Sequence, residues 1–366
     1  MTINFTRQVQ RLPSSVPFVG PETLERQRGQ CFLSRIGANE SAFGLSPAAL
    51  EAMSDSLGVS GCSWYADPEN HDLRSALAKL HNVDINCICV DAGIDSLLGL
   101  TVRMLMETGD HVVTSDGAYP TFNYHVHGFG GVLNKVPYKH NREDPQALCE
   151  AADQHNARLI YMANPDNPMG TWHGAEVIQT MIDNLPKHSA LLLDEAYVEF
   201  APQGTSPPID CDNSQVIRFR TFSKAYGMAG MRIGYAIAHP QMIIGFNKIR
   251  NHFAVNRLAQ IAALASINDK KFLRSVMEKV QTGRERIYQF ASKYDLTYLP
   301  SATNFVAVNL QTSARAKSVL SELNKQGVFL RMPGVAPLNR FIRVGIGSEE
   351  EHKIFVEQFS QHILAI

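Results

Sequence analysis

Residues 220–235 read RTFSKAYGMAGMRIGY, and this stretch places Lys224 where an apolar strand pattern ends and a glycine-rich segment begins. Two hydroxyl groups, from Thr221 and Ser223, precede the lysine, and Arg232 adds a fixed cation eight residues after it. An amine among cations is less basic, so near neutral pH it can attack an aldehyde, while hydroxyls and an arginine suit a phosphate ester. The stretch therefore predicts a site for a phosphorylated aldehyde joined to Lys224 as a Schiff base.

Two upstream motifs decide between this chemistry and a solvated Ser-Lys turn, which is the commoner structure for so short a pattern. Residues 190–200, ALLLDEAYVEF, form an apolar run that ends on Asp194 and Glu195, and Tyr197 follows three residues after the aspartate. Residues 161–170, YMANPDNPMG, form a second apolar run that leads into an Asn/Pro turn. Because open parallel sheets bind ligands beyond the carboxyl ends of their strands, a carboxylate there predicts a ligand site.

Taken in order, the three motifs resemble those of the fold-type-I pyridoxal-phosphate (PLP) aminotransferases and, within them, the histidinol-phosphate aminotransferase branch. The patterns N-P-x-N-P-x-G, D-E-A-Y-x-E-F and T-x-S-K with a later arginine are all present, and the resemblance runs from about Pro17 to the C-terminus. It implies an α/β fold, with a mostly parallel central sheet covered by helices on both faces and a smaller α+β C-terminal lobe. It also implies PLP as the cofactor.

The resemblance implies a chemical role for each motif residue. Lys224 would bind the cofactor aldehyde and then, as the catalytic base, move the proton between the substrate Cα and the cofactor. Asp194 would keep the ring nitrogen protonated, and Tyr197 with Asn167 would hydrogen-bond the phenolic oxygen of the ring.

The cofactor's phosphate needs donors, and the resemblance supplies them. Gly93 precedes a predicted helix whose first amides are free to bind an anion. Tyr119 aligns with the ring that stacks on the cofactor, and Tyr65 aligns with a tyrosine that reaches the phosphate of the partner subunit, which implies a homodimer. The phosphate would be bound by hydroxyls, a guanidinium and these amides: Thr221, Ser223, Arg232, Ile94, Asp95 and Ser96.

Two arginines carry the substrate prediction. Arg343 matches the family arginine that binds the substrate carboxylate in a bidentate fork, and Arg331 matches a second cation useful for the phosphate of histidinol phosphate. Asn39 matches the polar opening of the family's N-E-N-P-like motif and is expected at the substrate. The implied reaction moves an amino group between histidinol phosphate, or an aromatic or apolar amino acid, and a 2-oxo acid such as 2-oxoglutarate.

Three departures from the family patterns leave the substrate open. Met169 replaces the usual threonine of N-P-x-N-P-T-G, and residues 41–42 read Ser-Ala in place of a polar-proline pair. Residues 332–338, MPGVAPL, form an apolar spacer between the two arginines. Such a spacer beside the substrate would suit an aromatic or other apolar side chain.

Alternative functions share parts of this pattern. A decarboxylase resembling threonine-phosphate decarboxylase would use every cofactor residue and differ in how the substrate carboxylate lies against the ring. A non-catalytic PLP-binding regulator is disfavoured because family members of that kind carry a DNA-binding N-terminal domain, whereas about 34 residues precede the enzyme-like core here. A dehydrogenase is disfavoured because residues 227–234, GMAGMRIG, lack the G-x-G-x-x-G spacing.

The composition of the chain argues against nucleic acid, membranes and metals as partners. The 366 residues contain 34 Lys plus Arg and 35 Asp plus Glu, so no net field favours nucleic acid or an anionic membrane. The N-terminus lacks a signal-peptide core, and no apolar run reaches the roughly 18 residues of a membrane span, so a cytoplasmic protein is expected. Six scattered cysteines predict buried, reduced thiols, and neither they nor the 13 histidines have metal-ligand spacing, so no metal is expected.

The order of elements predicts three parts. These are an N-terminal arm (residues 1–34, including PFVGP at 17–21), a large PLP-binding domain (35–255) and a small C-terminal domain that packs with the arm (256–366). Apolar strands alternate with helical stretches up to about residue 240, which predicts the parallel sheet. Beyond it we expect long helices over about 240–268 and 270–294, strands near 304–309, 328–332 and 341–344, and helices near 313–326 and 348–364.

Overall fold

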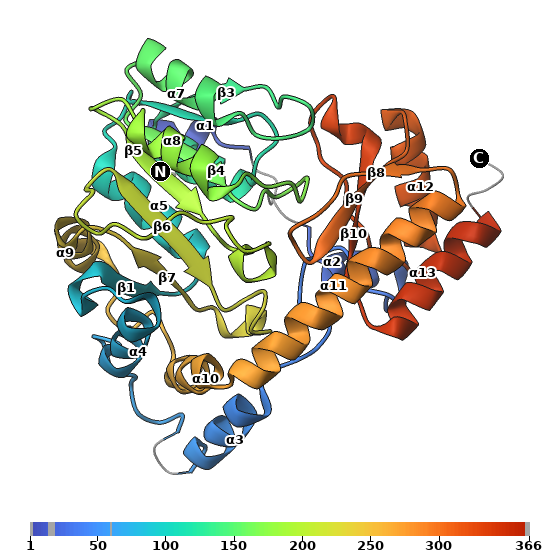
Figure 1. The fold of residues 1–366 in the computed structure, drawn as a ribbon, viewed down its shortest axis with the longest axis horizontal. Coiled ribbons are helices and arrows are strands. Elements are labelled where there is room, and N and C mark those ends of the chain that lie inside the picture. The colour runs from blue at the N-terminus through green and yellow to red at the C-terminus, as the bar shows by residue number, and fades with distance from the viewer. Residues whose placement is uncertain (1–2, 14–18, 59–60, 363–366) are drawn as a thin grey trace.

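The computed structural model describes residues 3–13, 19–58 and 61–362. Within these ranges, a seven-stranded sheet forms the centre of the larger lobe (Figure 1). Five neighbouring strands, β6, β5, β4, β2 and β3, pair in parallel. Strand β7 is antiparallel to both of its neighbours, β6 and β1, so the mostly parallel sheet is confirmed. In spatial order the strands are β1 (Ile88–Asp91), β7 (Gly234–Ile237), β6 (Val216–Thr221), β5 (Ala190–Asp194), β4 (Leu159–Ala163), β2 (His111–Ser115) and β3 (Val132–Val136).

Both faces of this sheet are buried, because successive side chains point to opposite faces and each face meets helices. In β4, Tyr161 belongs to the apolar cluster on one face and Ile160 to the cluster on the other. One face is covered by α5 (Ile94–Leu105) and α6 (Pro120–Gly128), and the other by α7 (Pro145–Gln154) and α8 (Ala175–Asp183). The continuous apolar runs in the sequence, rather than alternating ones, follow from this double burial.

The carboxyl ends of the central strands meet at one edge of the sheet. Ala163 at the end of β4 pairs with Asp194 at the end of β5, and Asp194 pairs in turn with Phe219 of β6. The segments that follow these strands carry all three sequence motifs. Their side chains therefore emerge side by side although they are far apart in the chain.

A smaller lobe lies beside the large sheet (Figure 1). Its antiparallel sheet has the order β10 (Phe341–Gly345), β9 (Phe305–Asn309) and β8 (Thr297–Tyr298). Helix α11 runs from α10 to this sheet and joins the two lobes along its length (Figure 1). The helices of the smaller lobe are α11 (Lys270–Lys293), α12 (Ser313–Lys325) and α13 (Glu349–His362).

The small sheet differs from the prediction in two places. Residues 328–332 form no continuous strand, because Val328 bridges to Ser34 and Arg331 to Arg343, so the backbone changes partner within four residues. The prediction of a strand there is wrong. The two-residue strand β8, which pairs with β9, had no signal in the sequence because it is too short to show an apolar period.

The helical pattern over 240–268 is interrupted in the structure. Helix α9 (Pro240–Ile249) ends before α10 (Arg257–Asn268) begins, and the side chain of Asn256 caps α10 by accepting a hydrogen bond from the Ala259 amide at 2.8 Å. The boundary predicted between residues 255 and 256 falls in this connection. The domain boundary stays a prediction. Helix α10, which the prediction assigns to the small domain, packs against two helices of the predicted large domain, α3 (Pro47–Ser56) and α4 (His71–His81).

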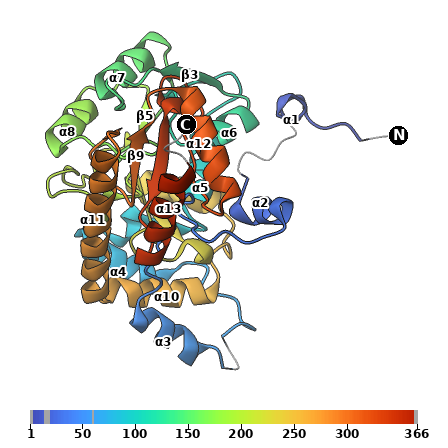
Figure 2. The same ribbon diagram turned by 90° about the vertical axis from the view of Figure 1, so that its right-hand side faces the viewer.

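The N-terminal arm contains two short helices. Helix α1 (Arg7–Arg11) lies against α6, and α2 (Pro21–Arg28) lies beside the smaller lobe, where Arg28 donates to the Lys325 carbonyl (Figure 2). Pro17 and Phe18 of the PFVGP stretch lie outside the described residues. Four 3₁₀ turns complete the described elements: η1 (Ile85–Cys87), η2 (Val198–Phe200), η3 (Ala229–Met231) and η4 (Leu338–Arg340).

The cysteines are all free thiols, as expected, but only three of the six are buried. Cys31 and Cys62 are exposed and Cys211 is half-buried, so the expectation that all six are buried is wrong. These three cysteines lie in connections rather than in strands or helices. Connections do not enforce the burial of a thiol. In the part of the chain that the structure describes, no helix combines the length and apolarity needed to cross a bilayer.

Candidate active site

Lys224 lies in the segment that follows β6, at the edge where the carboxyl ends of the strands meet. Its Nζ donates to the backbone oxygen of Asn39 at 3.2 Å and lies 5.6 Å from the centre of the Tyr197 ring. Among the described residues no carboxylate forms an ion pair with this amine within 4 Å. The amine is held by a neutral carbonyl, which leaves it free to react with a ligand.

Asp194 ends β5 and is 5% exposed. Its Oδ2 accepts a hydrogen bond of 2.8 Å from the Tyr161 hydroxyl, and its Oδ1 accepts one of 2.9 Å from the Ala196 amide. Burial raises the pKa of Asp194 to about 6, against the hydrogen bonds, and Lys224 acts on the carboxyl through space in the lowering direction. A buried carboxylate in this state gains from any cation that binds beside it.

The neighbouring Glu195 has the opposite environment. Its carboxylate binds Arg218 at 3.2 Å and Arg220 at 2.9 Å, and all three side chains lie largely out of solvent. Burial opposes ionisation, but Arg220 and Arg218 together keep the pKa of Glu195 below its ordinary value. Glu195 is thus neutralised within the protein, whereas no arginine pairs with Asp194 in the described chain. Of the two adjacent acids, only Asp194 can serve a ligand.

A chain of hydrogen bonds connects Tyr197 to Arg343. The Tyr197 hydroxyl accepts from Asn39 Nδ2 at 2.9 Å and from Asn167 Nδ2 at 3.5 Å. Asn167 Oδ1 in turn accepts from Arg343 Nη1 at 2.6 Å. The structure therefore brings together four residues predicted from separate motifs. Asn304 donates to the Asn39 carbonyl at 3.1 Å and so holds Asn39 in place.

The Arg343 guanidinium has a hydrogen-bond donor that no described residue uses. It lies 5.0 Å above the Phe305 ring, and its Nη2 donates to the Gly37 carbonyl at 3.3 Å. Its Nε has no hydrogen-bond partner among the described residues. Burial lowers the pKa of Arg343 to about 10, and the charge of Arg331 acts in the same direction. Two arginines close enough to repel each other favour an anionic ligand between them.

Arg331 approaches from the segment before β10. Its backbone oxygen accepts from the Arg343 amide at 2.7 Å, and its Nη2 donates to the Val19 carbonyl of the N-terminal arm at 2.9 Å. The guanidinium lies 5.5 Å from the Phe329 ring. The arm thus contacts a residue of the candidate site.

A cradle for an anion lies at the start of α5. Gly93 precedes this helix with φ +90°, and no side chain caps the helix start, so its first amides have no intrahelical acceptor. A Cβ built on Gly93 would meet Arg232 Nη2 at 2.8 Å, which places the guanidinium directly over the turn. Thr221 donates from its hydroxyl to Ser223 Oγ at 3.0 Å next to this turn.

The side chains of α5 add contacts that the sequence did not reveal. Asp95 Oδ1 accepts from the Tyr119 hydroxyl at 3.0 Å, and Asp95 Oδ2 lies 3.8 Å from Arg232 Nη2. Ser96 donates instead to Asp91 Oδ1 at 2.6 Å. The motifs indicated only the amides of this helix, because a contact between α5 and the Tyr119 turn requires the tertiary structure.

Tyr119 lies with the other predicted cofactor residues, because its hydroxyl donates to Asp95. Tyr65 does not lie near these residues of its own chain. Burial and the neighbouring Asp95 raise the pKa of Tyr119 above its ordinary value. The Tyr65 side chain is 82% exposed, and its ring lies 4.8 Å from that of Phe253 at the surface. Trp64 beside it is 63% exposed.

Two site residues escaped the sequence analysis although signals for them existed. Tyr161, which donates to Asp194, lies in the strand motif at a position that shares its face with the end of β5. Asn304 is a buried polar residue immediately before the apolar strand β9. The available signal was a side chain with a polar group within or next to an otherwise apolar run: the Tyr161 hydroxyl inside β4, and Asn304 directly before β9.

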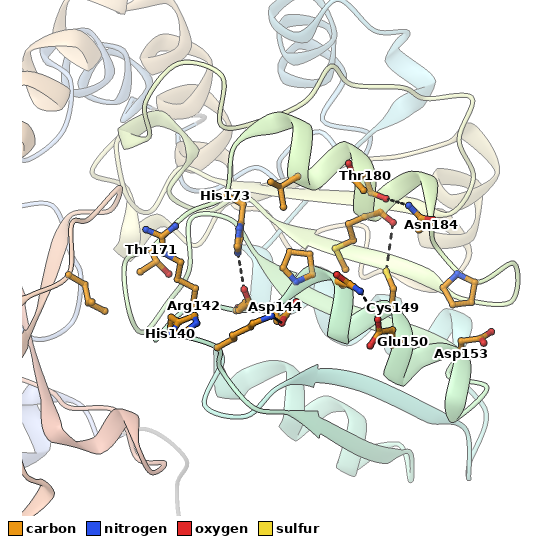
Figure 3. Close-up of a pocket in the computed structure, with 18 of the residues that line it drawn as sticks. His140, Arg142, Asp144, Cys149, Glu150, Asp153, Thr171, His173, Thr180 and Asn184 are labelled. Carbon is orange, nitrogen blue, oxygen red and sulfur yellow. Dashed lines mark hydrogen bonds and ion pairs between the residues drawn. The ribbon is translucent and has the colours of Figure 1, made fainter.

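A separate cavity of about 1150 Å³ lies between the 139–144 segment, α7 and α8 (Figure 3). Thr171 and His173 line it, and His173 Nε2 lies 2.8 Å from the Glu143 carbonyl oxygen. None of the site residues predicted from the sequence lines this cavity. The residues that gather around Lys224 therefore form a different site.

Comparison with known proteins identifies the family. The family model described as aminotransferase class I and II matches residues 34–359. A crystal structure of histidinol-phosphate aminotransferase from Sinorhizobium meliloti in complex with pyridoxal-5'-phosphate is 46% identical, with a TM-score of 0.96, over 100% of this chain and 99% of that one. Histidinol-phosphate aminotransferase 1 of Nitrosococcus oceani is 33% identical over 95% of this chain and 94% of its own, and histidinol-phosphate aminotransferase 2 of Carboxydothermus hydrogenoformans is 30% identical over 96% and 97%.

Proposed function

Because this chain belongs to the class I and II aminotransferases and is a PLP-dependent enzyme similar to histidinol-phosphate aminotransferases, we propose that Lys224 and Asp194 are its central catalytic residues. The amino group would move between histidinol phosphate, or an aromatic or apolar amino acid, and a 2-oxo acid such as 2-oxoglutarate. One arrangement carries the assignment of residues: an amine bonded only to a backbone carbonyl lies near a buried carboxylate that has no ion-pair partner among the described residues, and a hydrogen-bond chain links Tyr197 beside that amine to Arg343, whose Nε is unpaired.

The side chains present fit PLP at each of its polar groups. Lys224 offers an amine bonded only to a carbonyl, and Asp194 offers a carboxylate without a salt bridge for the ring nitrogen. Arg232 over the Gly93 turn offers a cation and open amides for the phosphate. Tyr197 would donate to the phenolic oxygen, since its hydroxyl already accepts from Asn39 and Asn167.

The chain's residues then divide the work of the reaction. When bound, PLP withdraws electrons from the Cα of an attached amino compound and makes its proton acidic. Asp194 keeps the ring nitrogen protonated by supplying the nearby negative charge. Lys224 takes the Cα proton and returns it, and such a positioned base contributes about 10²–10⁴-fold to the rate. Asn39 holds the amine near Tyr197 while no ligand displaces it.

Two departures from the family pattern have a packing explanation. Met169 is fully buried and packs in one apolar cluster with Leu338 of the spacer, together with Ala307 and Phe341. Their side chains are therefore occupied by core packing rather than turned towards a substrate. The spacer gives no support for an aromatic donor through Leu338, and the arginine pair, Arg331 with Arg343, supports a donor with an anionic end.

Replacing Arg343 by lysine is expected to raise the KM for amino donors and 2-oxo acids by about 10-fold or more, because a bidentate charge-assisted pair is lost. kcat should change less, since the reacting atoms are untouched. Steady-state kinetics with histidinol phosphate, phenylalanine and 2-oxoglutarate measure this. Arg340→Lys, at a neighbouring half-buried arginine that donates to Asn141 and to the Pro337 carbonyl, serves as control. A KM that stays at the wild-type value would remove Arg343 from the substrate site.

A decarboxylase would use the same cofactor residues, so the reaction itself needs a direct test. Incubation with histidinol phosphate, phenylalanine, tyrosine and threonine phosphate should convert the bound cofactor to its amino form, which absorbance detects. Release of CO₂ without that form would establish decarboxylation instead. The donor with the highest kcat/KM identifies the substrate class.

The exposed aromatic surface supports a homodimer, and we place the enzyme in the cytoplasm as its free thiols suggest. Tyr65 and Trp64 are unusually exposed for aromatic side chains and would be covered by a second chain. Tyr65 would then donate to the phosphate bound in that chain.

Tyr65→Phe is expected to raise the Kd for PLP by about 10-fold, because one hydrogen bond to a charged phosphate is lost. Trp64→Phe, next to it, should leave the Kd unchanged. Equilibrium dialysis gives both values, and sedimentation gives the oligomeric state. When Tyr65→Ala and Lys224→Ala proteins are unfolded and refolded together, activity should reappear through mixed dimers. A monomer, or a Tyr65→Phe protein with the wild-type Kd, would contradict the shared site.

A further inference from the structure

Two buried carboxyl groups meet behind the substrate arginine. Glu143 lies in the connection between β3 and α7, and Asp166 lies in the turn that follows β4; each is 2% exposed. Their side chains are within hydrogen-bonding reach of each other. Two ionised carboxylates in such contact without a bound cation would repel strongly, so the pair holds one proton between them near neutral pH.

The surrounding donors indicate where the proton lies. Asp166 accepts at both oxygens, from the Tyr138 hydroxyl at 2.9 Å and from the Met169 amide at 3.1 Å. Glu143 accepts from Ser115 Oγ at 3.1 Å and more weakly from the Ala163 amide at 3.4 Å. Asp166 has the stronger set of donors, so it is the anion and Glu143 carries the proton.

Other charged groups near the pair do not neutralise it. The Arg343 charge acts on Asp166 through space, and the His173 ring contacts only the backbone oxygen of Glu143. Tyr161 faces Glu143 from β4. Neither carboxyl forms an ion pair with a cation in the described part of the chain. Burial raises the pKa of Glu143 well above its ordinary value, in agreement with a retained proton.

Asp166 also shapes the turn that carries Asn167. Its backbone N–H donates to the Thr171 carbonyl at 2.8 Å, and its own carbonyl accepts from Gly170 at 3.0 Å. With the bond from Met169 to its side chain, these contacts close the turn on both sides. Asn167, the next residue, is the one that binds both Arg343 and Tyr197.

We propose that Asp166, held as a single anion by a protonated Glu143, is a positioning residue that fixes Asn167 against Arg343 and so sets the affinity for the substrate's anionic end. This inference rests on the proposed function for its kinetic consequence. The shared proton itself is a property of the folded chain and is testable without substrate.

Two isosteric substitutions separate the partners. Glu143→Gln retains a donor towards Asp166, so the KM for amino donors should stay within about twofold of wild type. Asp166→Asn removes the negative charge and one of the two acceptor oxygens, so the Tyr138 hydroxyl and the Met169 amide can no longer both donate to this side chain, and the KM should rise about 10-fold or more with a smaller change in kcat. Glu150→Gln, at an exposed carboxylate on α7, is the control.

The stability of the protein without substrate tests the proton. Glu143 keeps its proton in the fold but loses it in the unfolded chain above about pH 4.5, so the wild-type free energy of unfolding should fall as the pH rises. Glu143→Gln has no such proton, so its urea midpoint should increase relative to wild type as the pH is raised above about 4.5. Parallel curves for the two proteins would overturn the shared proton.

The outcomes distinguish this inference from the proposed function. If Arg343→Lys raises the KM, the positioning role is refuted by either of two results. One is an unchanged KM in Asp166→Asn, and the other is an equal rise in KM in Asp166→Asn and Glu143→Gln. If Arg343→Lys also leaves the KM unchanged, the assignment of the substrate site fails instead. A raised KM only in Asp166→Asn, together with a pH-dependent gain in stability for Glu143→Gln, supports the proposal.

Discussion

Replacing Lys224 by alanine should lower the rate of transamination by about 10³–10⁴-fold, because the group that moves the Cα proton is removed. The same variant should lose the visible absorbance of covalently held cofactor, since alanine offers no amine. Stopped-flow kinetics and absorbance spectra of the purified protein measure the two effects.

Two further variants give this result its meaning. Lys224→Arg keeps a cation near Asn39 and Tyr197 but offers no neutral amine, so it should be as inactive as the alanine variant. Lys248→Ala, at an exposed lysine on α9, should behave as wild type. Activity retained in Lys224→Arg would show that a charge, rather than proton transfer, is what this position supplies.

Replacing Asp194 by asparagine is expected to weaken PLP binding by about 10²–10⁴-fold, because the buried cationic ring nitrogen would lose its charged partner at a cost of roughly 3–5 kcal/mol. The rate should fall as well, since a ring that loses its proton accepts electrons less readily. Asparagine keeps the size of the side chain and one acceptor for Tyr161. Equilibrium dialysis of PLP with wild type and variant measures the loss.

The pH dependence of PLP binding gives this prediction a sign. Burial raises the pKa of Asp194 to about 6, so in protein without PLP the carboxyl becomes protonated as the pH falls through that value. A neutral carboxyl cannot pair with a cation, so wild-type affinity should decrease below about pH 6 relative to the Asp194→Asn variant. The control is Glu199→Gln, which changes an acid with a buried carboxyl group outside the proposed site. Glu195→Gln is not used, because Glu195 forms ion pairs with Arg218 and Arg220. Equal pH profiles for wild type and Asp194→Asn would exclude Asp194 as the partner of the ring.

The residues proposed as catalytic could be placed together from the sequence because they lie near strand ends within local motifs. Lys224 and Asp194 each follow an apolar run, and the carboxyl ends of parallel strands meet at one edge whatever the details of packing. Asn167 and Arg343 were likewise named from their motifs, and the structure brings them within 2.6 Å of each other.

Contacts between distant segments could not be predicted from single motifs. Asp95 meets Tyr119 only after α5 and α6 pack together, and Glu143 meets Asp166 only after two connections fold over the sheet edge. The sequence shows neither the direction of a side chain in a loop nor the charge balance of a buried group. Such pairs are set by tertiary packing.

The errors in secondary structure have the same origin. Residues 328–332 have the composition of a strand, yet their partners, Ser34 and Arg343, belong to different segments and allow only single bridges. The 240–268 pattern has helical periodicity, but Asn256 caps a new helix within it. Local preference was overridden by the partners that the fold made available.

The assignment of Lys224 as the residue that holds PLP can be tested by reducing the protein–cofactor linkage with borohydride and mapping the labelled peptide. The label is expected on Lys224 in wild-type protein and should be absent from Lys224→Ala. A label on any other lysine, or an unchanged label in the variant, would contradict this assignment.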